Sequence, residues 1–157
     1  MARRVHRNGS GSPPRGAAAD ANTLWSRAVE LAQAGQIREA EKALAKLAKL
    51  APGNADIFGF HGTLKVQAGK HAQAVPLLKR ALRLDDDNPT SHGSLAVAYE
   101  GLSKLDKAKR HYLRSLELDP NQARTLVNLG SLLRQEGDYA AAISHYGKAI
   151  ELDGEFA

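Results

Sequence analysis

The chain has 157 residues, a formal net charge of +5 and no cysteine. This length indicates one domain with a buried core, and the lack of cysteine excludes disulfides, thiol catalysis and thiolate metal sites. Hydrophobic residues make up 43% of the chain, chiefly Ala and Leu, whereas aromatic residues make up only 5%, a balance that favours helices over sheets.

The first 20 residues differ in composition from the rest of the chain. They are rich in Gly, Ser, Pro and Arg, and residues 1–19 supply four of the five net positive charges. A segment with so little to bury does not offset its ordering entropy, so residues 1–20 are predicted to form a disordered basic tail. The remainder is close to neutral, and we therefore do not expect nucleic acid as a partner.

The sequence contains no signal for a membrane or for secretion. No apolar run approaches the roughly 20 residues that a membrane-spanning helix needs. The arginines of the tail are not followed by an apolar segment, as they would be in a secretory signal. We therefore expect no membrane span and a cytoplasmic location.

From residue 21 onward the sequence repeats with a period of 34 residues. Small residues, leucines and turn residues recur at this spacing in four columns: Ala40, Ala74, Ala108 and Ala142; Leu50, Leu84, Leu118 and Leu152; Ala28, Gly62, Ala96 and Gly130; and Gly35, Gly69, Ser103 and Gly137. Four columns in one phase define four units without insertions, at residues 21–54, 55–88, 89–122 and 123–156.

Each unit divides into two helices separated by a turn. In the fourth unit, leucines from Leu126 to Leu133 follow helical spacing, and Gly137 with Asp138 marks the turn to the second helix. The same division predicts helices near residues 22–34, 38–50, 55–68, 72–84, 89–102, 106–118, 122–136 and 140–152. One helix pair cannot bury both of its apolar faces, so we expect the pairs to stack into an all-α solenoid of eight helices.

The third and fourth units carry the pattern of a known helical repeat. Its residues here are Leu95, Ala96, Tyr99, Ala108, Tyr112 and Pro120, and then Leu126, Leu129, Gly130, Ala142, Tyr146 and Ala149. On these residues the chain resembles the tetratricopeptide repeat family over residues 21–156. The resemblance implies a right-handed α-solenoid of four helix–turn–helix repeats and a role as a scaffold or adaptor that binds another protein.

In proteins that this chain resembles, the first helices of the units line a concave groove that holds a peptide or helix of the partner. Carried over by position, the peptide-binding groove comprises Asn22, Trp25, Val29, Asp56, Phe60, Thr63, Val66, Ser94, Val97, Glu100, Arg124, Val127, Asn128, Ser131 and Arg134. Arg124 and Arg134 make its last unit basic, so we expect the partner segment to have an acidic part there. Gly59 and Gly93 are expected to leave room for the backbone of the ligand.

Two more specific binding modes of that family are not expected here. A carboxylate clamp needs Lys, Asn or Arg where this chain has Trp25, Val29, Gly59 and Gly93, so the C-terminal tail of a chaperone is not expected as a partner. A ladder of asparagines along the groove would be matched by Asn128 alone.

The sequence offers no motif for catalysis or for a cofactor. It lacks a nucleophile elbow, a phosphate loop and an HExxH sequence, so we expect no enzymatic activity, no catalytic residue and no cofactor. His111 and His145 lie one period apart on stacked second helices, but no further ligand accompanies them. We expect two exposed helix positions there and no metal site.

The last unit leaves two alternatives open. No capping element follows it in the chain, so we expect an apolar ridge that includes some of Leu133, Tyr139 and Ile143 to face solvent. The chain is then either a fragment of a longer protein, which we favour, or self-associates through this uncapped repeat. The resemblance adds an alternative function, because N-terminal repeat regions of bacterial glycosyltransferases and sulfotransferases recognise the substrate protein.

Overall fold

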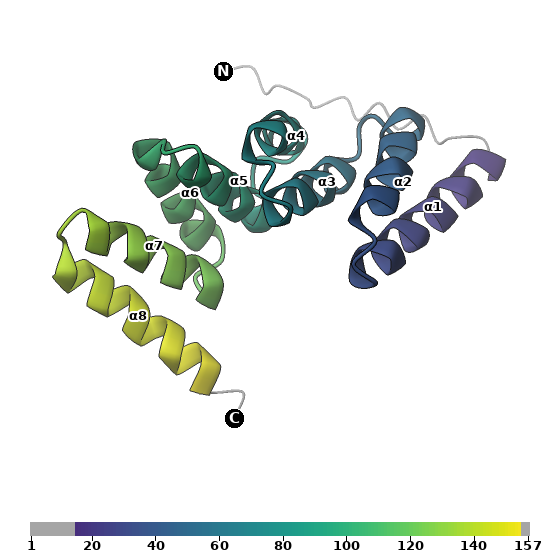
Figure 1. Cartoon of the computed structure of the whole chain (residues 1–157). Helices are drawn as coiled ribbons and strands as arrows, with labels where there is room; N and C mark the ends of the chain where they lie inside the picture. Colours follow the sequence, from purple (N-terminus) through teal and green to yellow (C-terminus); the bar gives the residue numbers. More distant parts are fainter. Residues whose placement is uncertain (1–14, 155–157) are drawn as a thin grey trace, which may run out of the picture.

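The computed structural model describes residues 15–154, with side chains from residue 20 onward. This part of the chain folds into eight helices and contains no strand (Figure 1). The helices are α1 (Arg15–Gln33), α2 (Ile37–Leu50), α3 (Ala55–Gln67), α4 (His71–Leu84), α5 (Pro89–Gly101), α6 (Leu105–Leu118), α7 (Ala123–Gln135) and α8 (Tyr139–Gly154). The predicted all-α helical repeat is confirmed, and α2 to α8 begin and end within two residues of the predicted bounds.

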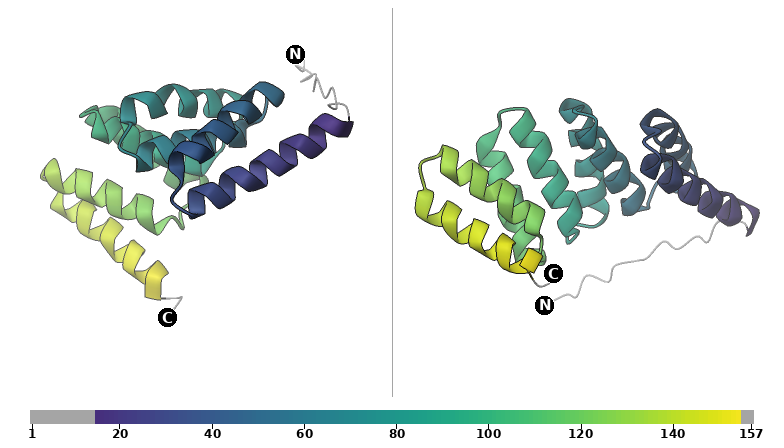
Figure 2. Two further views of the ribbon diagram at one scale, coloured as in Figure 1. Left: turned by 45° about the vertical axis from the view of Figure 1, so that its right-hand side comes forward. Right: turned by 60° about the horizontal axis from the view of Figure 1, so that its bottom comes forward.

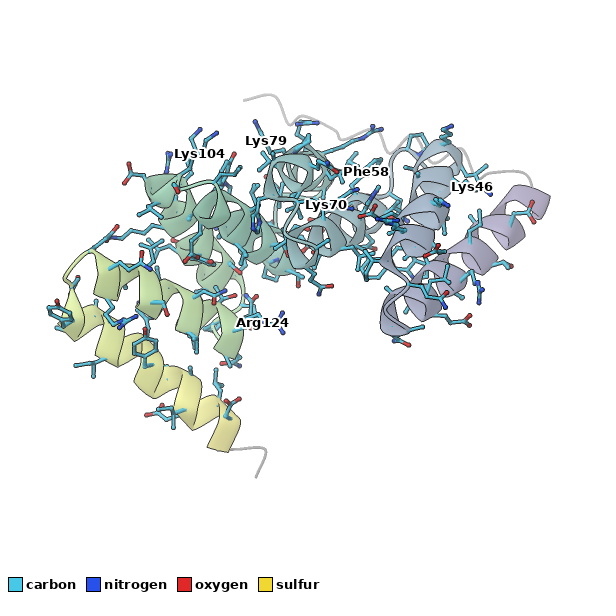
Figure 3. All side chains as sticks on the ribbon, viewed as in Figure 1. Lys46, Phe58, Lys70, Lys79, Lys104 and Arg124 are labelled. Carbon is cyan, nitrogen blue, oxygen red and sulfur yellow. The ribbon has the colours of Figure 1, made fainter. Side chains whose placement is uncertain are left out.

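The eight helices form four antiparallel pairs that follow one another along a curved array. Figure 2 shows the pairs side by side, with α1 and α2 at one end and α7 and α8 at the other. Lys46, Lys79 and Lys104 lie on the outer side of the array, and Arg124 lies on its inner side (Figure 3). The first helices of the pairs therefore line one face and the second helices the opposite face.

The first helix is longer than predicted. It begins at Arg15, so residues 15–20 are helical although they were assigned to the disordered tail. The alanines at positions 17, 18 and 19 explain the difference, since alanine has the highest intrinsic helix propensity and extends a helix at little cost. The prediction of disorder for residues 1–14 lies outside the described residues.

The turn column has the backbone conformation that its residues suggest. Gly35, Gly69 and Gly137 have φ values of 73°, 70° and 85°, and Ser103 has a φ of 57°. Positive φ lets the chain reverse directly after each first helix, and glycine adopts it without a steric penalty. Ser103 adopts the same conformation with a Cβ atom, so the third turn is the strained one of the four.

The two columns of small residues allow the helices to cross closely. Ala40, Ala74 and Ala108 are 0% exposed and Ala142 is 2% exposed. A Cβ atom on Gly62 would lie 2.5 Å from Cγ of Leu78, so α3 and α4 meet where only glycine fits. Gly130 is similar, because its Cβ atom would lie 2.8 Å from the Tyr146 ring on α8.

The buried apolar side chains of residues 20–154 form two clusters. One draws on α1, α2 and α3, and the other extends from α4 to α8. The two clusters meet at α3, where Lys65 and Glu41 form an ion pair of 2.8 Å with both side chains 14% exposed. Lys70 lies 3.5 Å from the other oxygen of Glu41, so this junction between repeats is ionic as well as apolar.

Helix α8 exposes an apolar stripe, as expected for the last unit. Tyr139, Ile143 and Ile150 are 64%, 70% and 71% exposed, whereas Leu133 is only 5% exposed and belongs to the core. The expectation was therefore correct for Tyr139 and Ile143 and wrong for Leu133. Leu133 lies on α7 and packs in the larger cluster, which makes its burial independent of any further helix.

We predict opposite effects for two glycine-to-alanine substitutions inside helices. Gly62→Ala should lower the free energy of unfolding by about 1–3 kcal/mol, because the new methyl group overlaps Leu78. Gly147→Ala should raise it by about 0.5–1 kcal/mol, because nothing lies within 4 Å and alanine is the better helix former. Urea unfolding followed by circular dichroism measures both, and a gain for Gly62→Ala would contradict the close crossing.

We also predict that Ser103→Gly stabilises the protein. Glycine removes the strain of a positive φ at this position, which should raise the free energy of unfolding by about 0.5–1 kcal/mol after its own entropy cost. Ser103→Ala is the matched control and should give no gain, because alanine retains the Cβ atom. Equal thermal midpoints for the two variants would show that the turn is not strained.

Candidate functional site

The inner face of the array contains a first hollow between α1, α3 and α5. It has a volume of about 340 Å³ and is lined by Trp25, Val29, Asp56, Gly59, Phe60, Thr63, Asn88, Thr90 and Ser91. The Trp25 and Phe60 rings lie 5.6 Å apart at 54° and form its apolar wall. Such an arrangement suits the burial of a large apolar side chain.

A second hollow continues the first along the same face. It has a volume of about 420 Å³, and its lining includes Thr63, Val66, Thr90, Ser94, Val97, Arg124 and Asn128. Thr63 and Thr90 line both hollows, so the two are continuous. The Thr63 and Ser94 hydroxyls lie 2.8 Å apart, and the Thr63 hydroxyl also donates to the Gly59 carbonyl, which fixes the side chains of this region.

A third hollow of about 350 Å³ adjoins the second. Its lining is largely polar and comprises His71, Val97, Glu100, Gly101, Tyr112 and Asn128. Val97 and Asn128 also line the second hollow, so all three hollows form one depression from α1 to α7. We call these three connected hollows the groove.

The polar end of the groove is organised by Tyr112. This side chain is fully buried on α6, and its hydroxyl donates a hydrogen bond of 2.6 Å to Oε2 of Glu100. Asn128 also hydrogen-bonds the phenol. Burial first, and then the bond to Glu100, raise the pKa of Tyr112 far above its usual value, so the phenol remains a proton donor at physiological pH.

The structure brings most of the predicted groove residues together. Eleven of the fifteen line the groove: Trp25, Val29, Asp56, Phe60, Thr63, Val66, Ser94, Val97, Glu100, Arg124 and Asn128. Asn22 lines a separate hollow beside it, which shares Trp25 and Asp56 with the groove. Their role in binding remains a prediction.

Val127, Ser131 and Arg134 line none of these hollows. Val127 is 43% exposed on α7, and the Ser131 hydroxyl lies 3.1 Å from the Tyr146 hydroxyl on α8. These residues belong to the last first helix, α7, and no further first helix lies beside it in the described chain to form the other wall of a hollow.

Sequence reasoning missed two contributors and misjudged two others. His71 and Tyr112 line the third hollow from second helices, which the positional rule for first helices does not cover. Gly59 and Gly93, expected to leave room for a ligand, are buried and serve helix packing as well, since a Cβ atom on Gly59 would lie 2.9 Å from the Ser91 hydroxyl.

Comparison with protein-family models gives two matches that together cover most of the chain. Both carry the description tetratricopeptide repeat, and they match residues 26–89 and 87–155. The chain belongs to the tetratricopeptide repeat family. This agrees with the helix pairs and with the period of 34 residues.

Among curated proteins, the mouse protein O-mannosyl-transferase TMTC1 is 27% identical over 126 residues. The match covers 78% of this chain and 13% of the transferase. The BBSome complex member BBS4 of Xenopus tropicalis is 29% identical, and the match covers 84% of this chain and 25% of that protein. This chain thus spans a quarter or less of the length of these relatives, so the similarity concerns their repeat regions.

Among solved structures, a MamA fragment from Desulfovibrio magneticus RS-1 has a TM-score of 0.77 at 22% identity. The alignment covers 86% of this chain and 76% of that structure, and it supports the fold. A mutant of the Thermobaculum terrenum O-GlcNAc transferase has a TM-score of 0.72 at 27% identity, over 76% of this chain and 23% of that structure.

The outer face holds a second group of ionisable side chains. A hollow between α5 and α6 is lined by His92, Tyr99, Lys107, Arg110, His111 and Arg114. His92 donates from Nε2 to the Asp86 carbonyl, so its Nδ1 accepts from Nδ1 of His111 at 2.9 Å. His111 thus pairs with His92 on the neighbouring helix, and it is half-buried, contrary to the expectation of an exposed position related to His145.

This outer hollow does not have the composition of a metal site. Within residues 15–154, no group of three or more His, Asp or Glu side chains is placed to hold a metal ion. Nor is any helix of the described part long and apolar enough to cross a membrane. The Arg114 guanidinium is paired with Asp87 and Glu117, which reduces the positive charge available for a ligand.

His111 should make the stability of the protein depend on pH. Burial first, and then the charges of His92 and Arg110, lower the pKa of His111 from 6.5 to about 4. Between these values the unfolded chain binds more protons than the folded chain, so stability is lost as the pH falls from about 6.5 to 4. The half-exposed ring reduces the effect to about 1–2 kcal/mol.

His111→Leu tests this dependence, because Leu77 occupies the corresponding position of the second repeat. We expect the variant to lose less unfolding free energy than the wild type between pH 7 and pH 4.5 in urea titrations. His61 and His145, whose pKa values burial also lowers, remain in both proteins and cancel in the comparison. Equal losses in the two proteins would contradict the assigned role of His111.

Proposed function

We propose that this protein is a scaffold or adaptor that binds a peptide or helical segment of a partner protein in the groove. The observation that carries the proposal is the continuity of the three hollows along the first helices. Their total length matches an extended segment or one face of a short helix, both of which proteins of helical repeats bind on concave surfaces.

The chemistry of the groove changes along its length, which restricts the partner. The end formed by α1 and α3 offers the Trp25 and Phe60 rings and Val29 to an apolar side chain. The middle offers hydroxyl groups of Thr63 and Ser94, which suit the backbone of an extended segment. Arg124 lines the second hollow and has no ion-pair partner among the described residues, so an acidic residue of the segment is proposed to lie there.

The alternative function, substrate recognition within a larger transferase, draws on two of the similar proteins. The TMTC1 and O-GlcNAc transferase matches share with this chain only 13% and 23% of their length. They support a binding role for the repeats and supply no catalytic residue to this chain. We therefore favour binding as the function and treat attachment to a transferase as one setting in which it would operate.

Blocking the centre of the groove should abolish binding without affecting stability. Thr90 is exposed and lines both apolar hollows, so Thr90→Arg would fill the groove while leaving core packing intact. We expect proteins captured from lysate by the full-length wild type to be lost with Thr90→Arg, and to be lost also with Phe60→Ala. The bound proteins would be identified and compared by quantitative mass spectrometry.

Gln73→Arg provides the matched control, because it adds the same side chain at an exposed position of α4 that lines no part of the groove. A second control, Lys79→Glu with Arg83→Glu, alters the outer face. Partners that survive Thr90→Arg but are lost with the outer-face variant would overturn the groove as the site. Sedimentation of each variant separates these effects from self-association through the exposed stripe on α8.

A further inference from the structure

We infer that Glu100 forms a specificity site for a cationic side chain, Lys or Arg, of the bound segment. The inference rests on the proposed function, since the segment must first occupy the groove. It adds a second charge requirement to the acidic residue proposed at Arg124. The partner segment then carries one acid and one base at a defined separation.

Glu100 lacks the partner that the protein gives its other partly buried glutamate. Glu41 and Glu100 are the described glutamates of intermediate exposure. Glu41 has Lys65 at 2.8 Å and Lys70 at 3.5 Å, whereas no ion pair within residues 20–154 includes Glu100. A half-buried carboxylate without a counter-ion is costly, and a cation from a partner would remove that cost.

The position of Glu100 in its helix makes this charge still less favourable. Glu100 precedes Gly101, the last residue of α5, and the amide of Leu102 already bonds to the Glu100 carbonyl. The C-terminal end of a helix has a partial negative charge from its free carbonyl groups, so it attracts cations and repels a carboxylate. No basic residue lies in the last turn of α5. A bound ammonium or guanidinium group would interact favourably with both the carboxylate and the helix end.

The surroundings of Glu100 fit a donor-rich group. The Tyr112 hydroxyl occupies Oε2 at 2.6 Å and orients the carboxylate, and no printed or further hydrogen bond is needed to hold it. The third hollow in front of these groups also has His71 in its wall, whose buried Nδ1 has no hydrogen-bond partner. Lys and Arg side chains bring several N–H donors, so they match a site whose free groups are acceptors.

The two charges set a spacing in the partner. Glu100 lies in the last turn of α5 and Arg124 in the first turn of α7. Thr90 is the residue of α5 that corresponds to Arg124, and ten residues of helix separate it from Glu100, which corresponds to about 15 Å along the helix axis. An extended chain covers this distance in about five residues. The acid and the base of an extended partner segment should therefore be at least about five residues apart.

The test uses a display library of random twelve-residue peptides, selected against the full-length protein. Selection is run in parallel against the wild type, Glu100→Gln and Thr90→Arg. Glu100→Gln keeps an oxygen that accepts the Tyr112 hydrogen bond and removes only the charge. Its thermal midpoint should equal or exceed that of the wild type, which shows that any change in selection is not caused by unfolding.

We expect the wild type to enrich peptides with Lys or Arg at a fixed separation from an acid, and Glu100→Gln to lose the basic preference while still selecting groove-dependent peptides. For a selected peptide, replacing its Lys by norleucine should weaken binding to the wild type about tenfold, as expected for a charge-assisted hydrogen bond, and should leave binding to Glu100→Gln unchanged. Selected peptides without a basic preference, or an equal loss in Glu100→Gln, would overturn the Glu100 site alone. Failure to enrich any peptide that Thr90→Arg rejects would overturn the proposed function itself.

Discussion

The close crossing of helices at the small-residue columns is the constraint on which the rest of this structure depends. Ala40, Ala74, Ala108 and Ala142 are at most 2% exposed, and Gly62 faces Leu78 with no room for a methyl group. A short distance between helices lets each pair bury one face within itself and present the other to its neighbour. The first helices then follow one another along the inner face, and the side chains between them form a continuous groove. The groove is thus a consequence of how the core packs.

The sequence predicts those features that recur in every unit and misses those that occur once. The columns at 34-residue spacing show the helices and the inner positions, because four copies of a pattern separate it from chance. The bond between Tyr112 and Glu100 occurs only in the third repeat and joins two helices through their side-chain geometry. The pairing of His111 with His92 is of the same kind. The early start of α1 at Arg15 escaped prediction because composition indicated a tail, whereas the local alanines favour a helix.

Polar contacts that differ from one junction to the next make the similar repeats distinct. Glu41 and Lys65 connect the first pair to the second, and the Thr63 and Ser94 hydroxyls connect α3 to α5. Farther along, the fully buried Ser115 donates to the Pro89 carbonyl at 2.8 Å. A buried polar group without its partner costs more than the bond contributes, so each junction accepts only its own neighbour. These bonds also hold the groove side chains in place before binding, which lowers the entropy cost of binding a segment.

Two charges in the groove oppose the electrostatics of their own helices, and their arrangement bears on the direction of a bound segment. Arg124 lies at the positive end of α7 and Glu100 at the negative end of α5, and each position costs about 0.3–1 kcal/mol relative to the opposite charge. Arg134, in the last turn of α7, shows the favourable arrangement. Residues that break a local rule without compensation in the fold tend to mark functional positions. Because one charge is positive and the other negative, a segment bound in reverse would place like charges together, and the groove would discriminate between the two directions through repulsion as well as attraction.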